Sequence, residues 1–253
     1  MRGKTLKEAA WHALGSVLDP ELDTPITELG FVSELKVDEA SGHISLRLRL
    51  PTFWCAANFA YLMAHDARQV LLTLPGVRTV GVVLEDHFAD CEITKGVNQG
   101  LRFDEVFPEE AIDELEVLRR RFIEKAYLQR HEVLLRLLMQ KLPVSQVLNL
   151  NLDDLLEDEL GLWVDQGKEH LLISSKTMDL LHNYLSRRRA LGLSTNPESP
   201  FALDPEGNLL SEATLEEYLK RCKTTRINIT FNRALCERLL ETRYGMELEK
   251  ARR

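Results

Sequence analysis

The fold is decided by residues 43–85, which have the sequence HISLRLRLPTFWCAANFAYLMAHDARQVLLTLPGVRTVGVVLE. Residues 44–50 alternate strictly between apolar and polar side chains, and this period of two is typical of a half-buried strand. Residues 57–74 predict a helix, because their apolar positions are followed by the stop signal Pro75-Gly76. Residues 77–85 are largely apolar and predict a further strand, so this stretch forms strand, helix and strand in that order.

The residues before this stretch add a helix and a partner strand. Residues 5–19, TLKEAAWHALGSVLD, carry apolar side chains at helical spacing and predict a helix that ends near Leu18. Asp19-Pro20-Glu21 then breaks it, because proline disfavours the helical state of the residue before it. The loop DEASG separates a first strand from the strand that begins at His43, which predicts a hairpin. We therefore expect a small domain over residues 1–86, an α-β-β-α-β sandwich.

The rest of the chain is more helical. Residues 87–107 contain glycines and no sustained period, and we predict an irregular linking segment there. Residues 108–253 predict a mostly helical domain with one short β-hairpin, whose turn is Gln166-Gly167-Lys168. Its helices include one that begins at Ser211 and a separate last one over residues 231–243. The predicted fold class is therefore α+β.

Composition narrows the class of protein. The chain has 253 residues and a formal net charge of -8, which does not favour nucleic-acid binding, although residues 220–253 are locally basic. No apolar run reaches the roughly 20 residues that span a bilayer, and the first residues lack the apolar core of a secretory signal. We expect a cytoplasmic protein with no membrane association.

The catalytic motifs of common enzyme classes are missing. The sequence has no phosphate-binding glycine loop, no G-x-S-x-G elbow and no H-E-x-x-H pair. Its four cysteines form no C-x-x-C pair, which argues against a zinc finger, and a cytoplasmic chain keeps them reduced. We expect a protein that is not an enzyme.

Cys55 is the sharpest candidate for chemistry. It lies between the end of a predicted strand and the start of a predicted helix, where unpaired amides and the helix dipole favour thiolate, the metal-binding form. The alternative is a small buried thiol beside Phe53 and Trp54. His87 and Cys91 are four residues apart, share a face if that segment is helical, and suit iron or zinc. Two ligands do not make a site, and the alternative is that both are structural or inert.

Four short motifs in order resemble the SufT/PaaD-like family of iron–sulfur and metal-centre assembly factors. They are Asp19-Pro20-Glu21, Leu29-Gly30, Thr52 with Cys55, and Leu74-Pro75-Gly76-Val77, within about the first 85 residues. The resemblance implies that Cys55 is a metal or cluster ligand and that Asp19, Glu21 and Thr52 accompany it. Ala56 follows the cysteine where many members have proline. Without the resemblance, Asp19 and Glu21 are interpreted as solvated acids of a helix-exit turn.

The resemblance also implies a cargo and partners. The cargo is iron or an iron–sulfur cluster, transiently bound, and the partners are a recipient apo-metalloenzyme, for instance an oxygenase, and other assembly proteins. One thiol cannot complete a four-coordinate site, so a homodimer or a partner must supply the remaining ligands. The alternative is a chaperone or interaction module that binds an apo-enzyme without touching metal.

The C-terminal half is similar, more weakly, to the catalytic domain of phage integrases. The similarity lies in KLPVSQVLNLNLDDL, VDQGKEHLLIS and SPFALDPEGNLLS, with Lys168 at the place of the family's lysine. Pro143 stands where those enzymes have an arginine, and Tyr244 lacks a nucleophile context, so recombinase activity is not expected. A nucleic-acid-binding scaffold is the remaining alternative, and exposed helix charge is the simpler interpretation. The basic residues concerned are Arg187, Arg188, Arg189, Lys220, Arg221, Lys223 and Arg226.

Overall fold

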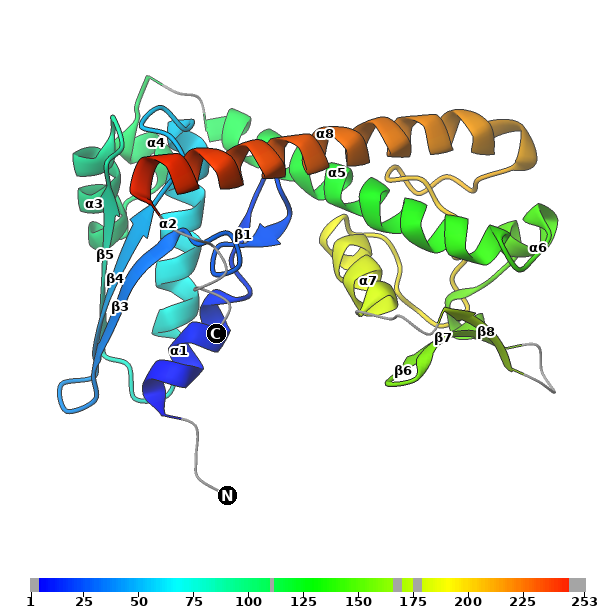
Figure 1. The fold of residues 1–253 in the computed structure, drawn as a ribbon, viewed down its shortest axis with the longest axis horizontal. Helices are drawn as coiled ribbons and strands as arrows, with labels where there is room; N and C mark the ends of the chain where they lie inside the picture. The colour runs from blue at the N-terminus through cyan, green and yellow to red at the C-terminus, as the bar shows by residue number, and fades with distance from the viewer. Residues whose placement is uncertain (1–4, 110–111, 166–169, 175–178, 246–253) are drawn as a thin grey trace. The chain divides into compact units, whose positions relative to one another are not determined.

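The chain folds into two units, which are described separately (Figure 1). In the computed structural model, the described residues are 5–109, 112–165, 170–174 and 179–245. The first unit combines Met1–Arg119 with Thr230–Arg253, and the second is Arg120–Ile229. The mixture of helices and small sheets confirms the predicted α+β class. In this part of the chain, no helix has both the length and the apolar character needed to cross a membrane.

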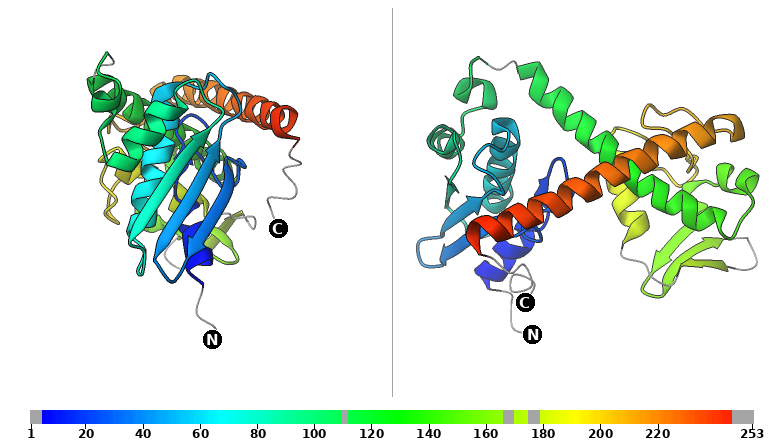
Figure 2. Two further views of the ribbon diagram at one scale, coloured as in Figure 1. Left: turned by 90° about the vertical axis from the view of Figure 1, so that its left-hand side faces the viewer. Right: turned by 45° about the horizontal axis from the view of Figure 1, so that its top comes forward.

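The first unit is built on a three-stranded sheet. Its strands are β3 (Val32–Asp38), β4 (His43–Arg49) and β5 (Thr79–Glu85), which lie side by side in that order (Figure 2, left). The predicted hairpin is confirmed, because β3 and β4 pair antiparallel. β4 and β5 pair in parallel, and the connection between them contains helix α2 (Ala57–Leu72). The carboxyl ends of β4 and β5 therefore lie at the same edge of the sheet.

A helix and a short strand pair precede this sheet in the chain. Helix α1 (Leu6–Leu14) begins with a capping box between Thr5 and Glu8 and ends earlier than the sequence predicted. Strands β1 (Leu18–Asp19) and β2 (Thr24–Pro25) then form a small antiparallel pair around the Asp-Pro-Glu turn.

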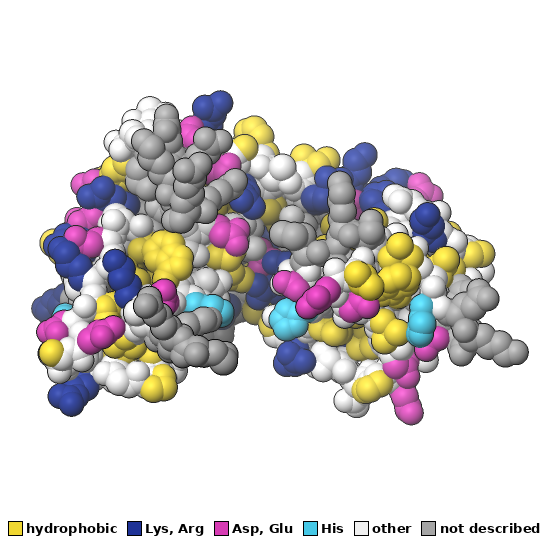
Figure 3. All heavy atoms as spheres, turned by 60° about the horizontal axis from the view of Figure 1, so that its bottom comes forward, with side chains coloured by type: hydrophobic (Ala, Val, Ile, Leu, Met, Phe, Trp, Pro, Cys, Tyr) yellow, Lys and Arg dark blue, Asp and Glu magenta, His cyan; other side chains and the backbone are white. Residues whose placement is uncertain are grey.

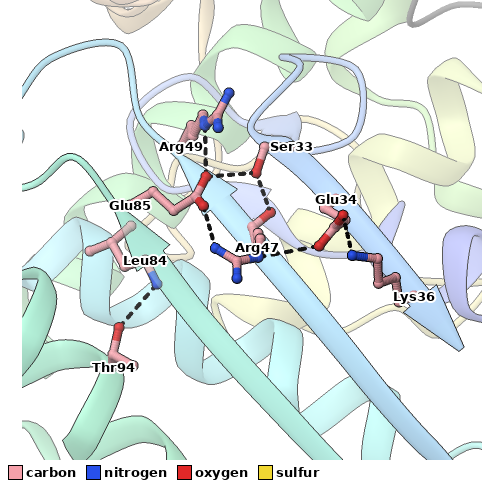
Figure 4. Close-up of polar contacts among 8 residues, drawn as sticks. All are labelled: Ser33, Glu34, Lys36, Arg47, Arg49, Leu84, Glu85 and Thr94. Carbon is pink, nitrogen blue, oxygen red and sulfur yellow. Dashed lines mark hydrogen bonds and ion pairs between the residues drawn. The ribbon is translucent and has the colours of Figure 1, made fainter.

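The two faces of the sheet follow the alternation of β4. Ile44, Leu46 and Leu48 are at most 1% exposed and pack in one core with the buried face of α2. On the other face, Glu85 accepts hydrogen bonds from Arg47 and Arg49, each at 2.6 Å (Figure 4). Exposed ion pairs of this kind contribute only about 0–1 kcal/mol each, so the buried face provides most of the stability.

The predicted linking segment, residues 87–107, is wrong as a description of this part of the chain. It forms helices α3 (Asp90–Gln99) and α4 (Phe103–Val106), and α3 packs along β5. Asn98 donates to the carbonyl oxygen of Val82 at 2.7 Å and accepts from its amide at 2.8 Å, so α3 covers the free edge of the sheet. The glycines that suggested a loop have other roles. Gly96 allows a close approach, since a Cβ there would lie 2.2 Å from the nearest Val106 methyl carbon.

The second unit contains the predicted hairpin and one further strand. Strands β6 (Leu155–Asp158), β7 (Gly161–Asp165) and β8 (His170–Ser174) form an antiparallel sheet in that order. The turn predicted at Gln166-Gly167-Lys168 lies outside the described residues. Helical elements make up most of the rest: α5 (Ile112–Met139), α6 (Val144–Leu148), the 3-10 turn η1 (Leu152–Asp154), α7 (Leu180–Ala190) and the first part of α8 (Glu212–Tyr244).

The interior of the second unit holds a fully buried polar group. His131 is 0% exposed, and its Nδ1 lies 2.7 Å from the hydroxyl of Tyr218. Burial, together with the nearby charge of Arg188, lowers the pKa of His131 to about 3. The imidazole is therefore neutral at physiological pH.

Helix α8 corrects the predicted C-terminal organisation. The two helices predicted after Ser211 are one continuous helix, Glu212–Tyr244, because nothing in the intervening residues breaks it. The division of the chain also differs from the predicted boundary at residue 108. Residues from Thr230 onward belong to the first unit, where Leu240 is 0% exposed in the same core as the sheet.

Candidate functional site

Cys55 lies in the loop between β4 and α2, as the sequence predicted. Because β4 and β5 are parallel neighbours, the loop after β5 lies beside it. Two hydrogen bonds join the loops. His87 Nε2 lies 2.7 Å from the carbonyl oxygen of Cys55, and the amide of Phe88 donates to the carbonyl oxygen of Phe53 at 3.0 Å. The position of the Cys55 backbone is thus fixed from a second strand end.

The Cys55 thiol has a polar side chain close to it. Thr52 Oγ1 lies 3.1 Å from its sulfur, and the thiol is partly exposed. Helix α2 begins just after it, and no side chain caps the N-terminus at Ala56. A partly exposed thiol before an uncapped helix start is placed to act as a ligand or nucleophile.

Asp19 is buried, so the interpretation as a solvated turn residue is wrong for it. It is 7% exposed, and its Oδ1 accepts hydrogen bonds from the amides of Glu21 at 2.9 Å and Leu22 at 2.8 Å. Burial raises the pKa of Asp19 to about 6, and the two backbone hydrogen bonds only partly offset this effect. Glu21 is half-buried and accepts a hydrogen bond at 3.1 Å from Asn232 of α8.

Helix α8 brings a second cysteine to this region, which the sequence analysis missed. Cys236 lies one turn after Asn232 and packs against the core of the first unit, as Cys55 does. Burial raises the pKa of Cys236 to about 12, and the negative charges of Asp19, Cys55 and Glu21 add to this rise. These charges come from three of the predicted site residues. The spacing of Asn232, Cys236 and Leu240 by four was the available signal.

His87 lies before helix α3, so the condition under which it would share a helical face with Cys91 is not met. Helix α3 begins at Asp90, so His87 precedes it. The Nδ1 of His87 accepts a hydrogen bond from the amide of Ala89 at 3.1 Å, and Nε2 therefore carries the proton donated to Cys55. Neither ring nitrogen keeps a lone pair for a metal in this arrangement. His87 is a positioning residue for the Cys55 loop, and Cys91 is an exposed residue in the first turn of α3.

The ligand set around Cys55 is incomplete within this chain. Across the described residues, no three side chains of histidine, cysteine, aspartate or glutamate converge in a way that would hold a metal ion. Most metal centres in proteins have four or more ligands. An ion held by Cys55 therefore cannot take all of its ligands from the described residues, and sulfide, solvent or another protein must supply the rest.

Exposed aromatic side chains surround the site. Phe53 is 49% exposed, Trp54 is 76% exposed and Phe88 is 53% exposed. All three come from the two joined loops after β4 and β5. A group of large exposed aromatics beside one thiol is typical of a surface that contacts another protein.

A family comparison matches this unit. Residues 7–82 match the model of a family described as iron–sulfur cluster assembly protein. These residues are therefore similar to this family. The match confirms the resemblance stated from the motifs, and it includes Asp19, Glu21, Thr52 and Cys55. The match stops before His87 and before α8.

Individual relatives match about a third of the chain each. The chain is 33% identical over 81 residues to the Fe-S cluster assembly factor HCF101, chloroplastic, of Arabidopsis thaliana, and 35% identical over 72 residues to the protein of that name in Oryza sativa subsp. japonica. These matches span 32% and 28% of this chain but only 15% and 13% of those proteins. An uncharacterized protein, MJ1129 of Methanocaldococcus jannaschii, is 29% identical over 89 residues, which are 35% of this chain and 90% of that protein.

Proposed function

We propose that this protein is an iron–sulfur cluster assembly factor that holds iron or a cluster transiently through Cys55 and transfers it to a recipient apo-metalloenzyme. The observation behind the proposal is the position of Cys55, a partly exposed thiol inside the family's matched region. Two neighbouring loops hold it in place through His87. The relatives named as assembly factors support the same role.

The incomplete ligand set fits a transfer function. A closed four-ligand site retains its metal, whereas a site with few protein ligands leaves positions for the donor and the acceptor. The missing ligands would come from a second copy of the chain or from another assembly protein. We also propose a reducing, cytoplasmic setting, because all four cysteines are free thiols.

The test is anaerobic reconstitution of the full chain with iron and sulfide, followed by visible absorption and metal analysis. Wild type should bind iron with charge-transfer bands, and Cys55→Ser should lose most of both. Cys91→Ser is the matched control, because Cys91 is also a free thiol but lies on the exposed first turn of α3. Equal iron content in wild type and Cys55→Ser would refute the assignment of Cys55 as ligand.

A second candidate function is a chaperone-like module that binds an apo-enzyme without metal. The exposed aromatics of the Cys55 loops favour it, Trp54 most of all at 76% exposure. The two functions separate in an activation assay of a recipient enzyme. Loss of activation in Trp54→Ala together with full activation in Cys55→Ser would favour the chaperone, and loss in both variants would favour cargo transfer.

Nucleic-acid binding through the C-terminal half receives less support. Arg188 is 0% exposed, Lys220 pairs with Glu216 at 2.7 Å, and Arg226 pairs with the buried carboxylate of Glu132 at 2.8 Å. On the face shown in Figure 3, acidic and basic side chains are interspersed in each unit. Much of the positive charge is therefore neutralised locally, and electrostatic attraction to phosphates is correspondingly weaker.

A further inference from the structure

The last part of α8 crosses the Cys55 region of the first unit. At one end, Asn232 donates to Glu21 at 3.1 Å, beside the Asp-Pro-Glu turn. At the other end, Arg243 donates to the carbonyl oxygen of Asp86 at 2.6 Å and to that of Leu50 at 3.4 Å, at the carboxyl ends of β5 and β4. Leu240, between these ends, is fully buried in the core.

Cys236 lies between these two anchors and on the same side of the helix. It is one turn after Asn232 and one turn before Leu240, and side chains spaced by four share a helical face. Its partly buried side chain packs against the same core as that of Cys55. Cys55 follows Leu50 by five residues, and its carbonyl oxygen is bound by His87, the residue after Asp86. The anchors of α8 thus lie at the Asp-Pro-Glu turn and at the two strand ends from which the Cys55 loop and its neighbour start, with Cys236 between them along the helix.

A buried carboxylate contributes negative charge to this region. Asp19 accepts hydrogen bonds from two backbone amides through Oδ1. Its negative charge acts on Cys236, as do those of Glu21 and Cys55. The negative charge of Asp19 and Glu21 near Cys236 favours a cation in this region.

We propose that Cys236 is the second thiol ligand of the Cys55 site, so that a soft or borderline metal ion is held between the loop after β4 and helix α8. The proposal rests on the proposed function in taking Cys55 as a ligand, and it adds a residue that lies far outside the family's matched region, residues 7–82. On binding, each thiol loses its proton to solvent and forms one sulfur–metal bond. Solvent or a partner occupies the remaining positions.

The proposal gives α8 a function in the site. A metal ion bridging Cys55 and Cys236 joins two segments of the first unit that are distant in the sequence. Metal binding should therefore stabilise the docked position of Thr230–Tyr244, because an ion that binds only the folded arrangement shifts the equilibrium toward it. In return, release of the ion to a recipient needs both sulfur–metal bonds to break.

The test is an anaerobic titration of the reduced full chain with Cd2+, a soft ion that needs no sulfide. The readouts are the ultraviolet thiolate-to-metal absorption per bound ion and the number of protons released. Wild type should release about two protons per ion, and Cys55→Ser and Cys236→Ser should each show half the absorption and about one proton. Cys91→Ser is the control for adventitious binding by an exposed thiol, and its signal at the first equivalent should equal that of wild type.

Identical absorption and proton release in wild type and Cys236→Ser would overturn the proposal. Cys236→Ala is measured in parallel, with thermal unfolding of both variants without metal, so that a misfolded variant is recognised. This test and the test of the proposed function can fail independently. A two-thiolate Cd2+ signal with no iron uptake would support the Cys55–Cys236 pair and refute iron as the cargo. Iron uptake that depends on Cys55 but not on Cys236 would support the proposed function and refute the pair.

Discussion

Asp19 should cost the protein stability at neutral pH, and replacing it should show this directly. Its carboxyl is 7% exposed, and burial raises its pKa from 3.8 to about 6. A shift of this size corresponds to about 3 kcal/mol between the charged and neutral forms. We expect Asp19→Asn to stabilise the first unit by about 1–3 kcal/mol at pH 7.5. The lower end allows for the new amide, which needs a partner of its own.

The pH dependence has a definite sign. The folded state holds the Asp19 proton up to about pH 6, whereas the unfolded chain releases it near pH 3.8. The stability of wild type therefore falls as pH rises from about 3.8 to about 6, and above about pH 6 the ionised Asp19 carboxylate lowers the free energy of unfolding by its full amount. The advantage of Asp19→Asn should be largest at pH 7.5 and fall to roughly one third of that value at pH 4.5, because the folded carboxyl is then protonated while the unfolded one is still mostly ionised.

The assay is urea unfolding at several pH values, with tryptophan fluorescence as the signal. A Trp163→Phe background removes the only tryptophan of the second unit, so that Trp11 and Trp54 report on the first. Glu21→Gln is the matched control, because Glu21 is half-buried in the same turn and its amide variant can still accept from Asn232. The reasoning is refuted if Asp19→Asn gains no stability at pH 7.5, or if its gain is the same at pH 4.5.

Two further predictions concern other parts of the chain. In the second unit, acidification from pH 6.5 to 3.5 should remove about 4 kcal/mol of stability, because the buried His131 has a pKa of about 3 whereas the unfolded chain binds the proton below about pH 6.5. The measurement is urea unfolding followed by Trp163 fluorescence, in which His131→Gln should show a much weaker dependence of stability on pH. An unchanged pH dependence in His131→Gln would contradict the assignment. In the first unit, Asn98→Ala should lower the free energy of unfolding in urea by about 1–3 kcal/mol, because it removes both hydrogen bonds to Val82 at the sheet edge. Replacing the exposed neighbour, Gln99→Ala, is the control and should lower it by less than about 0.5 kcal/mol.

The sheet and its first helices were predictable because their signals are local. The alternation in residues 44–50 needs one buried face and nothing else, and the structure buries Ile44, Leu46 and Leu48 as this pattern requires. The position of Cys55 followed from the same reasoning, since it lies where the strand ends and the helix starts. The Asp19, Thr52 and Cys55 positions came from the family motifs, and the family match includes all of them.

The errors lie where distant contacts override the local pattern. Gly96 and Gly100 suggested a loop, but Gly96 permits the approach of Val106 and Gly100 ends α3 in a left-handed conformation with φ 72°. The docking of α8 was not predictable, since the hydrogen bond between Asn232 and Glu21 joins residues 211 positions apart. A solvated basic tail and a docked helix have the same local composition in this segment.

This connectivity decides how the site should be studied. The first unit is built from two chain segments, and the second unit is inserted between them. A fragment that ended near residue 119 would keep the family's matched region and Cys55 but would lose Leu240, Cys236 and the anchors at Glu21, Leu50 and Asp86. Loss of the buried Leu240 side chain alone removes about 2 kcal/mol of apolar burial and exposes the core beneath it. A fragment that bound metal weakly would therefore report the loss of α8, and only the full chain tests the site formed by Cys55 and its neighbours.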